Sequence, residues 1–313
     1  MAIDVALGIC FLSQTGVGIL GNSLLITLYL TSFLLGSNPK PTDLTIIHLA
    51  LVHTMMLLTR WIIMTSGMLG LQLVQNDAEC KLFTYVYRIT RALSICTTSL
   101  LSAVQAITIS PSTSFLFQLK VQIPNAIHAI LAILWIPNSL ISTNLLFQMV
   151  AAPNITNTDT NCYLVPISTL LQGLILTFMA IRDILALGLM SCCSGYMVLF
   201  LHRHGHQVQH LHSPSQGPET SPERRATQTI VLLVSCFVVF YCGDLVFSLF
   251  LGTSMKNNAA IFNASMFMTS GYATVSPYVL LTCDRRVIKF LADFLGNRFL
   301  KSSQTTVLSS SPL

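Results

Sequence analysis

Long apolar runs separated by short polar segments fill almost the whole of this sequence. The runs lie at about residues 5–35, 42–69, 80–110, 124–150, 166–201, 226–252 and 259–283. Each exceeds the roughly 20 mostly apolar residues that a helix needs to cross a bilayer. The pattern therefore predicts an all-α membrane protein, a bundle of seven transmembrane helices joined by short loops.

Prolines and polar residues mark the ends of the runs, and the segment behind the last run has its own pattern. Pro39 and Pro41 follow the first run and Pro111 follows the third; a proline removes a hydrogen bond from a helix interior. Residues 284–300 combine basic and apolar residues at helical spacing, which is typical of a short amphipathic helix on the membrane surface. We expect residues 1–301 to form one transmembrane domain and residues 302–313 a flexible cytoplasmic tail.

The composition agrees with this pattern and excludes other classes of protein. Of the 313 residues, 53% are hydrophobic and only 9% are charged, whereas soluble domains carry about 25% charged residues. The charged residues lie mostly in the gaps between apolar runs. They do not form the basic stripe with interleaved aromatics that nucleic-acid binding requires, so we expect membrane lipid and no nucleic acid among the partners.

The distribution of lysine and arginine predicts the orientation in the membrane. With the N-terminus outside, the cytoplasmic segments hold ten of these residues and the outer loops hold two, Lys81 and Lys256. This asymmetry predicts an outside N-terminus and a cytoplasmic C-terminus. The ten are Lys40, Lys120, Arg203, Arg224, Arg225, Arg285, Arg286, Lys289, Arg298 and Lys301.

Two features fit the outer side under this orientation. Asn154-Ile155-Thr156, in the loop before the fifth run, is a glycosylation sequon. Cys80, at the start of the third run, and Cys162, in the same loop as the sequon, both lie on the oxidising side. We therefore expect a Cys80–Cys162 disulfide that holds this loop over the end of the third helix.

Away from the ends of the predicted spans, six charged residues are expected to lie inside the bilayer, where each needs a partner or a cavity. Arg88 and Arg91 are three residues apart on one face of the third helix, roughly 12 and 16 Å below Cys80. Asp244 has a similar depth in the sixth run, so we expect it to approach Arg88 or Arg91. The six are Arg60, Arg88, Arg91, Arg182, Asp183 and Asp244.

Two interpretations of these charges stay open. They form structural ion pairs that fix helix packing, or they line a ligand pocket in the outer half of the bundle. The coinciding depths of Arg88, Arg91 and Asp244 favour the pocket, and Tyr85 and Tyr87 on the same helix are further candidate ligand contacts. Four arginines against two aspartates leave the interior positive, so an anionic ligand is reasonable beside volatile or steroid-like ones.

The other intramembrane charges are expected to have individual partners. Arg182 and Asp183 are adjacent, and adjacent residues point about 100 degrees apart on a helix. We therefore expect them not to pair well with each other and to find partners on neighbouring helices. Arg60 lies near the outer end of the second run and is expected to extend to the membrane interface.

Histidines supply the remaining candidate chemistry. Five of them, between His202 and His212, crowd the stretch after the fifth run; they suggest a divalent metal, but the flanking Ser, Pro and Gly favour a solvated cytoplasmic loop. His48, His53 and His128 lie in spans and are expected to form hydrogen bonds within the bundle. The sequence holds no His-Glu-x-x-His, Gly-x-Ser-x-Gly or phosphate-loop motif, so we expect no enzyme, metal site or cofactor.

Some motifs resemble those of rhodopsin-like receptors and others depart from them. Gly21-Asn22 matches the Gly-Asn of their first helix, and Ser276-Pro277 lies where they carry Asn-Pro in the seventh. The third helix ends without Asp-Arg-Tyr, the sixth lacks the Cys-Trp-x-Pro bend, and His53 stands where the second helix normally has aspartate. The chain therefore resembles a divergent branch of these receptors.

Longer motifs run through the chain at residues 107–112, 182–183, 188–191, 194–198, 201–204, 221–230 and 271–277. Together with the departures above, they resemble the vomeronasal type-1 receptor family over nearly the whole chain. The resemblance implies a plasma-membrane, G-protein-coupled receptor for pheromone-like small molecules that signals through an inhibitory-type heterotrimeric G protein. Its contacts with the G protein would include Thr108, Arg203, Arg224, Arg225 and Gln228.

Three alternatives remain at the level of sequence. A bitter taste receptor is the nearest, but Ser-Pro-Glu-Arg-Arg-Ala-Thr-Gln-Thr-Ile at residues 221–230 argues against it. A small-solute transporter or channel needs a polar path through both halves of the membrane, and the inner third of most spans is apolar. The third is a receptor-like chain that no longer signals.

Overall fold

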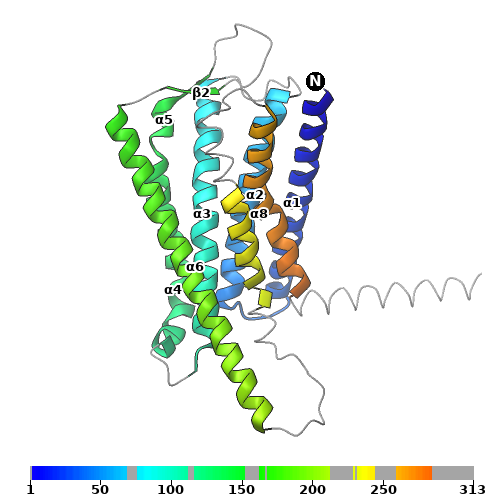
Figure 1. Cartoon of the computed structure of the whole chain (residues 1–313), viewed down its shortest axis with the longest axis vertical. Helices are drawn as coiled ribbons and strands as arrows, with labels where there is room; N and C mark the ends of the chain where they lie inside the picture. Colours follow the sequence, from blue (N-terminus) through cyan, green and yellow to red (C-terminus); the bar gives the residue numbers. More distant parts are fainter. Residues whose placement is uncertain are drawn as a thin grey trace, which may run out of the picture.

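Helices that run side by side make up nearly all of the described part of the protein (Figure 1). The computed structural model describes residues 2–68, 76–111, 116–151, 162–165, 168–211, 228–229, 231–243 and 259–283. The elements are α1 (Ala2–Leu34), α2 (Pro41–Met68), α3 (Asp77–Ile109), α4 (Leu116–Ser142), α5 (Leu145–Gln148), β1 (Met149–Ala151), β2 (Cys162–Leu164), α6 (Thr169–Leu211), the helix Val231–Gly243 and α8 (Ala259–Cys283).

The helices have the length and composition of membrane spans. Among the described residues, five stretches are long and apolar enough to cross a bilayer: they lie in α1, α2, α3, α4 with α5, and α6. Val231–Gly243 is a shorter apolar helix within the described part of the chain. The predicted all-helical architecture is therefore present, with one short β-hairpin added to it.

Helix α3 lies at the centre of the bundle and α6 at its edge. In the most apolar stretch of each helix, 67% of α3 is buried but only 11% of α6. Leu101 of α3 is fully buried in a core that also contains Leu25 of α1, Met190 of α6 and Leu233 of the helix Val231–Gly243. Because α3 contacts several helices at once, its side chains can form part of more than one site.

Helices α1 and α8 approach each other closely where the sequence carries Gly21-Asn22. A Cβ atom on Gly21 would lie 2.9 Å from the ring of Tyr278 and 3.0 Å from Pro277. The Asn22 side chain donates from Nδ2 to the carbonyl oxygen of Ala273 at 2.9 Å. In this motif, Gly21 allows the two helices to approach closely, and Asn22 forms a hydrogen bond between them.

The predicted start of the fourth span is wrong, whereas its predicted end near residue 150 lies close to Gln148, where the apolar stretch ends. The prediction started the helix at Pro124, but α4 begins at Leu116 and contains both Pro124 and Pro137. In a transmembrane helix, neighbouring helices and side chains can satisfy the backbone groups that a proline frees. The helix ends at Ser142, and α5 and β1 occupy the rest of the predicted span.

The fifth apolar stretch lies at Thr169–Phe200, close to the predicted limits, but the helix α6 continues beyond it to Leu211. The stretch expected to be a solvated loop therefore begins as about three further turns of helix. Figure 1 shows this end of α6 extending beyond the other helices. A long apolar run marks only the part of a helix that is expected to lie within the bilayer, so the pattern could not indicate this extension.

A two-stranded antiparallel hairpin lies between α5 and α6, where the sequence predicted the end of the fourth span and a polar loop. β1 pairs with β2 in the register Met149↔Leu164 and Ala151↔Cys162. The hairpin lies at the same end of the bundle as the N-terminus (Figure 1). Strands of three residues are too short to show an alternating pattern.

Candidate functional site

A cavity of about 440 Å³ lies between α3, α5 and α6. Its volume is within the range of small-molecule pockets. Arg88 and Arg91 both line it, so the two residues share the face of α3 that their spacing indicated. Its other polar lining residues include Tyr87, Asn144, Gln148, Gln172, Arg182 and Asp183.

Arg88 bridges the cavity with neutral partners. Its Nη1 atom donates to Asn144 Oδ1 at 3.3 Å, and its Nη2 atom lies 2.9 Å from the sulfur of Met179. Neither acceptor carries a charge. The two contacts hold the guanidinium between α3, α6 and the turn before α5 while leaving its positive charge at the cavity wall.

Arg182 and Asp183 pair with each other, which corrects the sequence prediction. Arg182 Nη2 lies 2.7 Å from Asp183 Oδ1, and Arg182 Nε donates to the same oxygen at 2.9 Å. The Cβ atoms diverge as expected, but the long arginine side chain bends back to reach the carboxylate. Each residue also contacts a neighbouring helix: Arg182 Nη1 donates to Asn138 Oδ1 at 3.2 Å, and Tyr241 donates to Asp183 Oδ2 at 3.2 Å.

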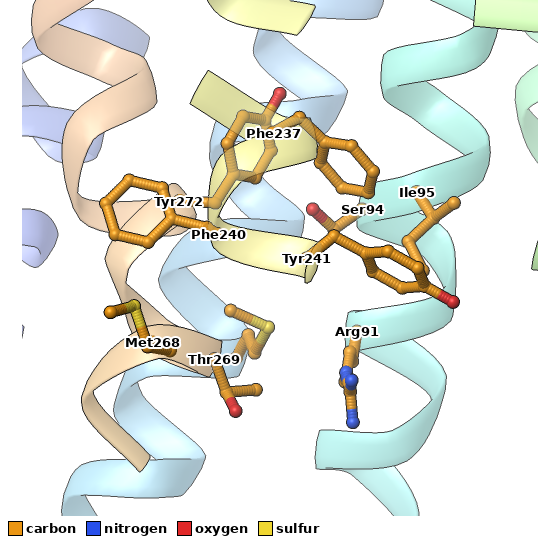
Figure 2. Close-up of a pocket in the computed structure, with 10 residues that line it drawn as sticks. Arg91, Ser94, Ile95, Phe237, Phe240, Tyr241, Met268, Thr269 and Tyr272 are labelled. Carbon is orange, nitrogen blue, oxygen red and sulfur yellow. The ribbon is translucent and has the colours of Figure 1, made fainter. Parts of the chain in front are cut away.

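A second, smaller cavity of about 40 Å³ adjoins the first. Arg91 and Ile95 line both cavities, so the two meet at this part of α3. Figure 2 shows aromatic side chains gathered between α3 and α8 around the smaller cavity. They are Phe237, Phe240, Tyr241 and Tyr272.

The other candidate residues of the outer pocket fall into different surroundings. Tyr87 lines the larger cavity, and the Arg60 guanidinium lies 4.7 Å from the centre of its ring. Arg60 was expected to extend to the membrane interface, but attraction between the cation and the aromatic face turns it inward. Tyr85 faces α4 instead, where its hydroxyl donates to the carbonyl of Ser139 at 3.4 Å.

His53 forms a buried polar cluster beneath the smaller cavity. It is fully buried, with Nε2 2.7 Å from the hydroxyl of Ser94 and Nδ1 2.9 Å from that of Ser276. His48 is also bonded, to Thr97 at 3.1 Å. The expectation of hydrogen bonds within the bundle is confirmed for these two histidines, whereas His128 is exposed on α4.

Comparison with known proteins decides which family this arrangement belongs to. Residues 5–293 match the model of the vomeronasal organ pheromone receptor family. The chain belongs to the vomeronasal type-1 receptor family. It is therefore a multi-pass membrane receptor and not an enzyme.

Individual members of the family match over nearly their whole length. The chain is 36% identical to vomeronasal type-1 receptor 42 of Mus musculus over 299 residues, which cover 94% of this chain and 90% of that receptor. It is 37% identical to vomeronasal type-1 receptor 100 of Rattus norvegicus over 286 residues, which cover 90% of this chain and 87% of that receptor.

Three of the residues expected to meet a G protein are exposed. They are Thr108 on α3, Arg203 on α6 and Gln228. A contact that the sequence did not indicate lies nearby: the hydroxyl groups of Ser110 and Tyr196 are 2.8 Å apart and join α3 to α6. Arg224 and Arg225 lie outside the described residues.

Other predictions concern residues that the structure does not describe. Asp244 and Asn154 lie outside the described residues, as do the side chains of Cys162 and of the histidines from His204 to His212. Cys80 is buried and disulfide-bonded. Its pairing with Cys162, whose backbone lies in β2, stays a prediction.

Proposed function

We propose that this member of the vomeronasal type-1 receptor family is a G-protein-coupled chemosensory receptor. The chain crosses the membrane seven times, with the N-terminus outside and the C-terminus in the cytoplasm. A pheromone-like small molecule binds in the larger cavity and shifts the inner ends of α3, α6 and the helix Val231–Gly243. The observation that carries this proposal is a cavity of about 440 Å³ whose wall is formed partly by the central helix α3.

The chemistry of the cavity wall supports a small ligand that combines an apolar body with a polar group. Arg88 and Arg91 supply positive charge from α3, and Ile175 and Leu176 supply apolar surface from α6. Pockets of this kind are mostly apolar, with a few polar groups that fix the orientation of the ligand. Volatile, steroid-like and anionic compounds all fit this description.

The exposed inner ends of the helices support contact with an inhibitory-type heterotrimeric G protein. Thr108, Arg203 and Gln228 are exposed there, and Arg224 and Arg225 are included in the proposed contact. Ligand binding changes this surface only if the ligand has different affinities for the two arrangements of the bundle.

A cell assay tests this function. Cells that express the chain with an inhibitory-type G protein are screened with volatile, steroid-like and anionic compounds, and the fall in cyclic AMP is recorded. We expect responses that disappear when the inhibitory-type G protein is blocked. Good surface expression without a response to any compound would contradict the signalling proposal and leave the family assignment unchanged.

A further inference from the structure

A chain of polar contacts crosses the bundle from α4 through α6 to the helix Val231–Gly243. Asn138 of α4 accepts a hydrogen bond from Arg182, Arg182 pairs with Asp183, and Asp183 accepts a hydrogen bond from Tyr241. Arg182 and Asp183 line the larger cavity, and Tyr241 lines the smaller one. The contacts therefore connect the wall of one cavity to a helix that borders the other.

We propose that the Asp183–Tyr241 hydrogen bond is a latch between the ligand cavity and the helix Val231–Gly243. While the bond is intact, it favours the arrangement described here. A ligand that bonds to Arg182 or Asp183 breaks it and releases Tyr241 together with its helix. The inference rests on the proposed function, because it supplies the step between ligand binding and helix movement.

The burial of the ion pair suits this role. The side chains of Arg182 and Asp183 are 15% and 16% exposed, so they can be reached from the cavity but are largely removed from solvent. Asp183 has one oxygen bonded to Arg182 and the other bonded to Tyr241. A ligand group that takes over Arg182 removes the contact that fixes the carboxylate, so the carboxylate can turn away from Tyr241. A bond formed only when the latch is open gives the ligand its preference for that arrangement.

The ring of Tyr241 is held independently of its hydroxyl. It stacks on Phe237 with ring centres 5.7 Å apart, and Phe237 meets Tyr272 edge-on at 4.9 Å. Removing the hydroxyl alone therefore leaves the aromatic packing in place. The substitution Tyr241→Phe therefore removes the proposed latch and keeps the packing of the ring.

The test compares Tyr241→Phe with Tyr278→Phe in the full chain. Tyr278 donates to the carbonyl of Val17 at 2.8 Å, so the control also loses a tyrosine hydrogen bond between two helices, but away from both cavities. The first readout is ligand-independent activation of the G protein by the unlabelled variants. The second is the distance between fluorescent labels on noncanonical residues at positions 203 and 228, which needs no G protein.

We expect Tyr241→Phe to raise ligand-independent signalling by about tenfold, because a hydrogen bond to a carboxylate contributes about that factor or more to an equilibrium. The label distance should change in Tyr241→Phe and stay at the parent value in Tyr278→Phe. A changed distance without G-protein activation supports the latch and places the failure in the proposed coupling. A folded Tyr241→Phe protein with the parent's label distance and signalling overturns the latch.

Discussion

His53 joins three helices through the two nitrogens of its ring. Ser94 of α3 and Ser276 of α8 bond to it, and its ring meets that of Tyr272 edge-on at 5.3 Å between centres. Tyr272 in turn has its hydroxyl 3.0 Å from that of Thr98. At this position a neutral imidazole can accept from one serine and donate to the other, so it satisfies both hydroxyl groups without placing a charge in the membrane interior.

Replacing this histidine should destabilise the protein. His53→Leu leaves two buried hydroxyl groups without their partner, and we expect a loss of about 1–3 kcal/mol. The measurement is thermal unfolding of the purified protein in detergent. His128→Leu is the control, because His128 is exposed on α4. Equal unfolding temperatures for the two variants would show that the His53 cluster does not stabilise the bundle.

Helices were predictable from the sequence where apolar runs end at prolines or polar loops. α1, α2 and α3 begin and end within three residues of the predicted limits. The errors at Pro124 and at the end of α6 have a common cause. Apolar runs and turn residues are local signals in the sequence, whereas the contacts that let a helix continue past them are not.

At the site, the shared face of Arg88 and Arg91 follows from helical spacing alone. The partners Asn138 and Tyr241 do not, because contacts between distant helices leave no local signal.

The close approach of α1 and α8 gives a test at the scale of elements. Gly21→Ala places a methyl group 2.9 Å from the Tyr278 ring, and overpacking of this kind costs about 1–3 kcal/mol. Gly16→Ala is the control on the same helix, because a Cβ atom there meets nothing within 4 Å. We expect a lower unfolding temperature for Gly21→Ala and no decrease for Gly16→Ala. A Gly21→Ala protein as stable as the parent would mean that the two helices can separate without cost.

At the scale of the whole molecule, the central position of α3 connects the proposed ligand site to the proposed G-protein contact. Its N-terminal half carries Arg88 and Arg91, its middle bonds to His53 through Ser94, and its C-terminal end bonds to Tyr196 through Ser110. A displacement of α3 at the proposed ligand site would therefore also move the residues of α3 that contact His53 and Tyr196.

The proposed orientation makes a prediction for the intact cell. An N-terminal epitope should bind antibody on unpermeabilised cells, and a C-terminal epitope only after permeabilisation, because lysine and arginine concentrate in the segments assigned to the cytoplasm. Asn154→Gln should also increase the electrophoretic mobility of the protein by removing a glycan. Access to the C-terminal epitope on intact cells would contradict the orientation, and access to both epitopes on intact cells would also contradict an odd number of spans.

The most direct test of the account is the dependence of the ligand response on Arg91, which lines both cavities. For a compound that activates the parent receptor, we expect Arg91→Ala to raise the half-maximal concentration about tenfold or more, since a hydrogen bond to a charged group contributes on that order. Arg91→Lys, which keeps the charge, should retain much of the response at equal surface expression. An unchanged half-maximal concentration in Arg91→Ala would contradict the placement of the ligand in the larger cavity.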